Sequence, residues 1–146
     1  MSDTVIKTKQ LTKKYGKQTV VNKVNLTVKK GRIYGLLGRN GAGKTTIMKM
    51  ILGLTTTTSG NNIDGNEKRI YSRIGAIIET PGFYPNLTGT ENLEIFAKLR
   101  GTASPNAVKH ALEVVGLPYK DKKTFAKYSL GMKQRLGIAN AILHDP

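Results

Sequence analysis

Apolar and polar positions alternate in the N-terminal third of the chain. Residues 5–8 and 20–28 are rich in β-branched side chains at roughly every second position. This pattern predicts two strands that each keep one face in water. Residues 15–18 (Tyr-Gly-Lys-Gln) predict the turn between them, and residues 29–31 (Lys-Lys-Gly) break the pattern. The chain therefore begins with antiparallel β-structure.

Two later apolar runs lack this alternation. Residues 33–37 (Ile-Tyr-Gly-Leu-Leu) and 74–78 (Ile-Gly-Ala-Ile-Ile) are nearly continuous, which is typical of strands buried on both faces of a parallel sheet. Between them, residues 54–60, with four consecutive threonines, predict a loop, and Asp64-Gly65 predicts a turn. Apolar residues at helical spacing also predict a mostly buried helix after the first run: Ile47, Met48, Ile51 and Leu52.

Residues typical of helix N-termini predict three helices in the second half of the chain. Thr88 and Glu91 have the spacing of a capping box. Ser104 places a capping side chain before a proline at the first helical position. Ser129 starts a third helix, whose apolar residues share one face: Met132, Leu136, Ala139 and Leu143. The order of β-structure, a strand–loop–helix unit and further helices predicts an α/β fold.

Composition limits the chemistry that the chain can perform. It has 146 residues, a formal net charge of +15, no cysteine and two histidines, His110 and His144. Disulfides, Cys-ligated metals and thiol catalysis are excluded, and a multi-histidine metal site is not expected. Without a signal peptide or an apolar run near the roughly 20 residues that span a bilayer, we expect a soluble intracellular domain. The positive charge indicates either a solvated surface or one that attracts phosphates or anionic lipids.

The pattern Gly38-x4-Gly43-Lys44-Thr45 carries the most specific chemistry in the sequence. It matches the phosphate-binding loop known as Walker A, with the required strand before it and helix after it. Glycines let backbone N–H groups turn toward phosphates, and the helix start adds the positive end of its dipole. Lys44 would bridge the β- and γ-phosphates, and the Thr45 hydroxyl would hold Mg²⁺. The candidate nucleotide-binding residues of this loop are Gly38, Arg39, Asn40, Gly41, Ala42, Gly43, Lys44, Thr45 and Thr46.

With this loop in place, the chain resembles the ATP-binding subunit of an ABC transporter along essentially its whole length. Tyr15 stands where that family carries the aromatic residue that stacks on adenine. Residues 128–135 resemble the family's signature motif, Leu-Ser-Gly-Gly-Gln, and retain its serine and one glycine as Ser129 and Gly131. Taken alone, Tyr15 could be surface decoration and Ser129 an ordinary helix cap, but both lie in the family's register.

The chain departs from the family's pattern at several positions. Arg39 replaces the usual proline of the Walker A loop, while Leu130 and Met132 replace a glycine and a glutamine of the signature. Glu79 stands at the Q-loop glutamine, where its carboxylate would either bind Mg²⁺ more strongly than a glutamine does or repel the γ-phosphate. Glu79, the residues that follow it and Tyr-Ser-Leu-Gly-Met resemble bacterial exporters of antimicrobial peptides, of the bacitracin and lantibiotic immunity type.

The family's Walker B strand, its catalytic glutamate and its switch histidine have no counterpart in the sequence. Residues 142–146 (Ile-Leu-His-Asp-Pro) resemble the segment just ahead of Walker B. The resemblance therefore implies the N-terminal part of a subunit, an incomplete P-loop ATPase core with an antiparallel β edge and an inserted helical subdomain. Its expected divisions are a nucleotide-binding core (1–80), the helical subdomain (81–128) and the signature helix returning to the core (129–146). Missing strands should expose apolar surface and leave the chain marginally stable.

The resemblance implies a cytoplasmic subunit, peripheral on the membrane, that couples ATP binding and hydrolysis to export of a peptide or drug. Its partners would be a transmembrane permease, contacted by the helical subdomain and the Glu79 loop, and a second ATP-binding subunit. In such a head-to-tail dimer, ATP lies between Tyr15, Lys44 and Thr45 of one copy and the signature residues Ser129 and Gly131 of the other.

Two alternative functions are compatible with the sequence. The missing Walker B carboxylates favour a nucleotide-binding fragment without turnover. The charge of +15 suggests a nucleic-acid-associated ATPase of the same superfamily. Such proteins normally carry a long charged insertion between Walker A and the signature, and this chain has none, so nucleic acid is not an expected partner.

Overall fold

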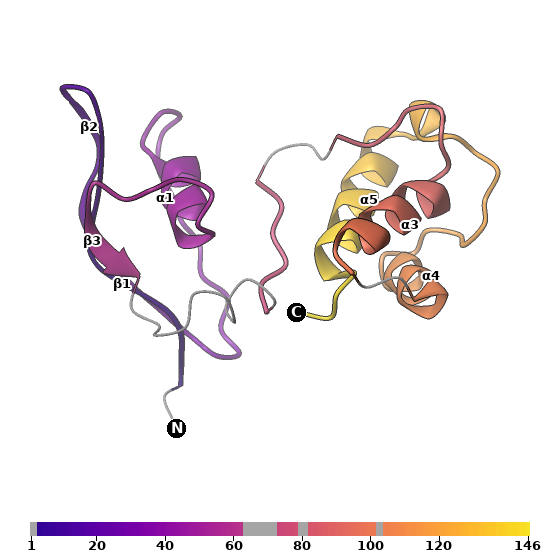
Figure 1. Ribbon diagram of the computed structural model, residues 1–146, viewed down its shortest axis with the longest axis horizontal. Helices are drawn as coiled ribbons and strands as arrows, with labels where there is room; N and C mark the ends of the chain where they lie inside the picture. The colour runs from indigo at the N-terminus through magenta and orange to yellow at the C-terminus, as the bar shows by residue number, and fades with distance from the viewer. Residues whose placement is uncertain (1–2, 63–72, 79–81, 102–103) are drawn as a thin grey trace. The chain divides into compact units, whose positions relative to one another are not determined.

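The computed structural model describes residues 3–62, 73–78, 82–101 and 104–146. The chain divides into two units, Met1–Lys68 and Arg69–Pro146, which we call the β unit and the helical unit (Figure 1). No helix in these described ranges has the length and apolar character needed to cross a bilayer. Glu79 and the turn predicted at Asp64-Gly65 lie outside the described residues.

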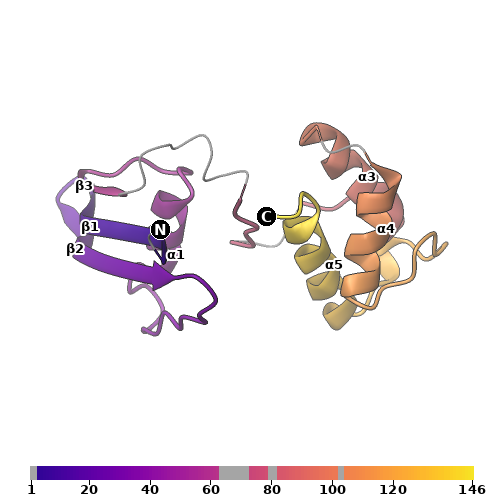
Figure 2. The ribbon, with the colours of Figure 1, turned by 90° about the horizontal axis from the view of Figure 1, so that it is seen from below.

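The β unit is built on a long antiparallel hairpin. Strand β1 (Thr4–Tyr15) pairs with β2 (Gln18–Lys29), and the short β3 (Ser59–Asn62) pairs with the other edge of β1 (Figure 2). The two predicted strands and their turn are confirmed, and both strands run further than the alternation of the sequence indicated. β3 occupies the end of the predicted threonine loop and was missed, because Ser59–Asn62 has no apolar pattern.

The pairing of β1 with β2 is irregular near the middle of β1. Its register shifts on both sides of Leu11 and again before Lys14. The hydroxyl of the buried Thr12 accepts a hydrogen bond from the Lys23 backbone N–H at 3.0 Å, where Lys23 has a positive φ of 50°. A buried side chain thus satisfies a donor that the irregular pairing leaves free, as burial requires.

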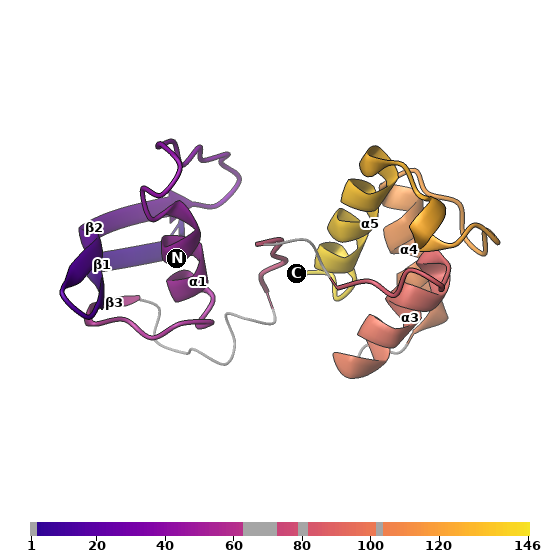
Figure 3. The same cartoon turned by 90° about the horizontal axis from the view of Figure 1, so that it is seen from above.

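Helix α1 (Lys44–Ile51) lies against the hairpin (Figure 3). A small apolar cluster joins them, made of Leu11 and Val21 from the strands and Ile47 and Met50 from the helix. The predicted helix is confirmed, but its buried face is wrong in one position: Met48 is exposed, and Met50 is buried instead. Helix α1 packs on the hairpin with one face, to which the half-buried Ile51 also belongs, and Met48 lies off that face.

The two buried parallel strands predicted at 33–37 and 74–78 are wrong. Neither segment forms a strand, and the side chains of Ile33 and Leu37 are almost fully exposed. A strand buried on both faces needs hydrogen-bonded neighbours and covering helices. In the described part of the chain, all the paired strands are antiparallel and none lies beside these two segments. Both segments have the apolar pattern of buried strands, but the described part of the chain forms no parallel sheet around them.

In the described part of the helical unit, three helices pack around one apolar core. They are α3 (Gly89–Leu99), α4 (Pro105–Val114) and α5 (Leu130–Ile142), with a short 3-10 turn η1 (Phe125–Lys127) before α5 (Figure 3). Twelve buried residues form this core: Phe83, Leu93, Ala97, Val108, Ala111, Leu112, Leu117, Phe125, Tyr128, Leu136, Ala139 and Leu143. The three helices predicted in this region are confirmed.

Two of the three predicted caps form as expected. The Thr88 hydroxyl accepts the Glu91 N–H at 3.2 Å, and the Glu91 carboxylate accepts the Thr88 N–H at 2.7 Å. The hydrogen bond from the Thr88 backbone N–H, with a smaller contribution from the Thr88 hydroxyl, holds the pKa of the Glu91 carboxylate below its usual value. Ser104 precedes a proline at the first position of α4, but its side chain makes no capping bond. Its backbone carbonyl accepts the N–H groups of Ala107 and Val108 instead, and its exposed side chain can be solvated by water.

Candidate nucleotide-binding site

The glycine-rich loop of residues 38–46, called the P-loop below, bends through backbone conformations that favour glycine. Gly41 and Gly43 have φ values of 83° and 88°. A Cβ atom on Gly43 would lie 2.7 Å from the Val20 carbonyl oxygen of β2, so a larger residue would push the loop off the hairpin. Gly43 also caps α1 and accepts the Ile47 N–H at 2.9 Å. The first turn of α1, whose N–H groups have no partner within the helix, therefore begins directly at the end of this loop.

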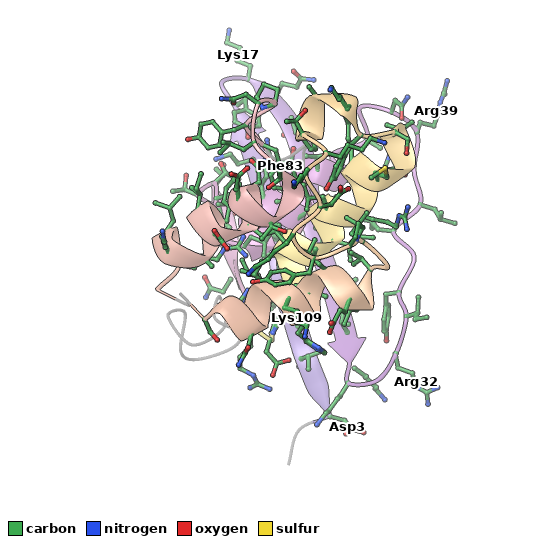
Figure 4. The ribbon with its side chains drawn as sticks, turned by 90° about the vertical axis from the view of Figure 1, so that its right-hand side faces the viewer. Asp3, Lys17, Arg32, Arg39, Phe83 and Lys109 are labelled. Atoms are coloured by element: carbon green, nitrogen blue, oxygen red, sulfur yellow. The ribbon has the colours of Figure 1, made fainter. Side chains whose placement is uncertain are left out.

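Lys44 is held by the backbone of its own loop. Its ammonium donates to the carbonyl oxygens of Gly38 at 2.6 Å and Arg39 at 2.8 Å. The Arg39 carbonyl also accepts the Ala42 N–H at 3.1 Å, while the Arg39 side chain extends away from the ribbon (Figure 4). Arg39 thus shapes the loop through its carbonyl. The Lys44 ammonium is therefore held against two carbonyl oxygens of the P-loop.

The rest of the P-loop is open to solvent and suits a phosphate ligand with its metal. Gly38 to Ala42 and Thr45 are exposed, whereas Gly43 is buried against β2. Thr45 lies in the first turn of α1 and offers the hard hydroxyl oxygen that Mg²⁺ prefers. The close approach at Gly43, the Lys44 ammonium and this hydroxyl fit a triphosphate with Mg²⁺. The second predicted Mg²⁺ ligand, Glu79, stays a prediction.

The structure brings Tyr15 to the same end of the hairpin as the P-loop. Tyr15 is the last residue of β1 and pairs with Gln18. Only two residues further along β2, Val20 meets the loop at Gly43. The Tyr15 side chain is 53% exposed. The exposed Tyr15 and the P-loop therefore belong to one unit of the structure and meet the same end of β2.

One residue near this site escaped the sequence analysis. Lys13 is buried, and its ammonium lies 5.0 Å from the centroid of the Tyr15 ring. No sequence signal marked it, because Leu11, Thr12 and Lys13 are all buried where the pairing of β1 is irregular, and the alternation of a regular strand does not apply there.

The signature residues lie together at the start of α5 in the helical unit. The Ser129 hydroxyl accepts the Met132 N–H at 3.2 Å and so caps the helix. Gly131 is exposed, with open space where a Cβ would stand. Leu130 between them is 73% exposed. Ser129 and Gly131 are therefore accessible to a ligand or to another chain.

A glycine-rich loop that runs into a helix, with lysine and threonine at its start, defines a P-loop nucleotide-binding protein. The family model described as ABC transporter matches residues 21–146. The chain therefore belongs to the ABC transporter family, as its motifs predicted.

Two relatives and one solved structure extend this assignment. The bacitracin transport ATP-binding protein BcrA of Enterococcus faecalis is 62% identical over 97% of this chain and 48% of its own length. The lantibiotic transport ATP-binding protein SrtF of Streptococcus pyogenes is 43% identical over 97% of this chain and 63% of its own length. A dimeric structure of MJ0796, a bacterial ABC transporter cassette, is 25% identical with a TM-score of 0.76, over 97% of this chain and 70% of its own.

These comparisons confirm both the fold class and the narrower resemblance to ATP-binding proteins of the bacitracin and lantibiotic type. The chain spans about half the length of BcrA. It carries part of the ABC ATPase P-loop fold, with antiparallel β-structure and helices.

Proposed function

We propose that this chain is the nucleotide-binding part of an ABC transporter's ATP-binding subunit, which couples ATP binding and hydrolysis to export of a peptide antibiotic. The carrying observation is the P-loop, where the Lys44 ammonium is held at the start of α1. The printed functions of BcrA and SrtF, bacitracin and lantibiotic transport, support the class of exported substrate.

In this proposal, the triphosphate lies on the P-loop and the adenine on Tyr15. Backbone N–H groups and the start of α1 donate to phosphate oxygens. The Lys44 ammonium exchanges the two carbonyls for phosphate oxygens, which carry full negative charge and bind it more strongly. Thr45, together with Glu79, would hold Mg²⁺, which neutralises phosphate charge when it is bound.

The proposal assigns ATP binding to these 146 residues and hydrolysis to the complete subunit. The sequence has no Walker B pattern, so it offers neither the aspartate that supports Mg²⁺ nor the glutamate that activates water. This chain should therefore bind ATP without turning it over.

Two macromolecular partners complete the proposed function. A second ATP-binding subunit would bring its own Ser129 and Gly131 to the bound ATP, and these residues are exposed as such a role requires. The dimeric form of the related cassette supports this arrangement. A transmembrane permease, contacted through the helical subdomain (81–128) and the Glu79 loop, would place the subunit on the cytoplasmic face of the membrane.

A thermal melt with and without Mg-ATP tests nucleotide binding. ATP at a hundredfold excess over its dissociation constant should stabilise the folded chain by about 2.7 kcal/mol. Lys44→Ala should abolish this shift, because it removes the cation that the proposed complex places between the phosphates. Lys122→Ala, which removes an exposed lysine from the helical unit, should leave the shift intact.

Phosphate release measured on the same proteins tests the second part of the proposal. Both the wild type and Lys44→Ala should show only background release. A stabilisation by ATP that survives Lys44→Ala would contradict the proposed site. Lys44-dependent turnover would contradict the assignment of hydrolysis to the complete subunit, and Glu79 would then be the first carboxylate to test as the base.

A further inference from the structure

Lys13 is a buried lysine with an unusual set of partners. Its residue is only 8% exposed, although lysine is almost never fully buried unless it is paired. Its ammonium donates to the Thr56 carbonyl oxygen at 2.5 Å and to the Thr56 hydroxyl at 3.4 Å. The same ammonium stands 5.0 Å from the centroid of the Tyr15 ring, which is a cation–π distance.

The carbonyl that anchors Lys13 is itself held in place. Thr56 belongs to the loop between α1 and β3, and Thr58 fastens this loop to β1. The Thr58 N–H donates to the Thr12 carbonyl at 2.9 Å, and the Thr58 hydroxyl accepts the Lys14 N–H at 2.9 Å. The Lys13 ammonium therefore has a fixed position. The surroundings of Tyr15 are built from two segments far apart in sequence, strand β1 and the loop between α1 and β3.

From these contacts we propose that Lys13 is a positioning residue for Tyr15. Anchored on the Thr56 carbonyl, its ammonium occupies one face of the Tyr15 ring and leaves the opposite face for the base of the nucleotide. This inference rests on the proposed function, because it assigns Lys13 a part in adenine binding.

The physical reason is pre-organisation. An exposed tyrosine at a strand end samples several rotamers, and fixing one of them on binding costs conformational entropy. A cation held against one ring face biases the ring before the ligand arrives, so less of that cost falls on binding. The cation also draws π-electron density toward itself, which reduces repulsion between the opposite face and the π-cloud of a stacked base.

A purely structural role for Lys13 predicts a different result. If Lys13 only fastened the threonine loop to β1, its loss would lower the stability of the β unit. It would then weaken binding of the triphosphate with or without its base. Comparing ATP with inorganic tripolyphosphate separates the two roles, since tripolyphosphate occupies the P-loop but has no adenine.

The test measures binding of both ligands to the 146-residue chain by calorimetry. Lys13→Met keeps the length of the side chain without the charge, and should weaken ATP binding about threefold to tenfold, the scale of a partly desolvated cation–π contact. Its affinity for tripolyphosphate should stay unchanged. Lys13→Arg, which keeps a cation, should bind ATP within about twofold of the wild type. Lys14→Met removes the same charge from the neighbouring exposed residue and should cause no ATP-selective loss.

A second measurement follows the ring itself. The chain contains no tryptophan, so Tyr15→Trp introduces a single fluorescent reporter at this position. Adding Lys13→Met to that variant should shift its emission before any nucleotide is present and reduce its quenching by ATP. In a Tyr15→Ala background, Lys13→Met should cause no further loss of ATP affinity.

Equal losses for ATP and tripolyphosphate in Lys13→Met would overturn the inference, and so would unchanged ATP binding in that variant. Failure of the proposed function has a separate signature. In that case, the wild type would bind neither ATP nor tripolyphosphate, or Lys44→Ala would bind the two ligands with wild-type affinity.

Discussion

The two units of this chain differ in how far they complete their own packing. In the helical unit, Leu93, Leu112 and Leu136 are completely buried in a continuous core. Among the described residues of the β unit, the buried cluster has four members, and Ile33 and Leu37 lie in water. The unit that binds the phosphates in our proposal is thus the less completely packed of the two.

The difference follows from where each kind of element finds its hydrogen bonds. A helix satisfies its backbone within one segment and has only to bury one face. A parallel strand must find its partners on other segments, so it depends on the rest of the sheet. The helices of the helical unit bury their apolar faces against one another within residues 82–146. The segment at 33–37, in contrast, has no strand beside it among the described residues.

The largest effect should come from the core of the helical unit. Leu93→Ala should lower the free energy of unfolding by about 3 kcal/mol, because it removes buried methyl groups and leaves a cavity. Urea unfolding followed by circular dichroism measures this. Leu99→Ala on the same helix, where the side chain is 76% exposed, should change stability by less than about 0.5 kcal/mol. Equal losses for the two variants would mean that this core is not tightly packed.

The next effect should appear in nucleotide affinity and belong to the β unit. Tyr15→Ala should weaken ATP binding by roughly 1–2 kcal/mol, the range for stacking of an aromatic ring on a base. Tyr84→Ala is the matched control, because Tyr84 is 50% exposed but belongs to the helical unit. Calorimetry that finds ATP affinity unchanged in Tyr15→Ala would remove Tyr15 from the site.

A smaller effect should separate the two roles of the signature serine. Ser129→Ala should lower stability by about 1 kcal/mol, because the cap of α5 is lost. Ser129→Asn should recover most of that loss, since asparagine also caps helices. ATP affinity of the single chain should not change in either variant, because the proposed nucleotide site lies in the β unit. A clear drop in that affinity would show that Ser129 contacts ATP within its own chain.

The smallest effect should come from the exposed apolar segment of the β unit. Leu37→Ser should change the free energy of unfolding by less than about 0.5 kcal/mol, because the side chain is 93% exposed. Ile47→Ser in the buried cluster of the same unit should be clearly destabilising. A large loss in Leu37→Ser, seen in chemical unfolding, would mean that residues 33–37 are packed in solution.

The starting points of helices and the identity of the P-loop could be predicted because each depends on a few neighbouring residues. Thr88 and Glu91 make their reciprocal bonds across three positions, and Lys44 reaches carbonyls only five and six residues away. Ser104 shows the limit of such local signals. It precedes α4 as predicted, but its side chain makes no capping hydrogen bond.

By itself, the sequence determined the hairpin, the positions of the helices, the glycine-rich loop ahead of α1 and the family to which the chain belongs. Only the tertiary structure decided that Lys13 lies against Tyr15, that β3 joins β1, and that Met50 rather than Met48 is buried. It also decided that residues 33–37 stay out of any sheet. The reason is physical: turns, caps and phosphate loops are closed by neighbours in the chain. Sheet pairing and burial depend on distant segments, which a local pattern does not specify.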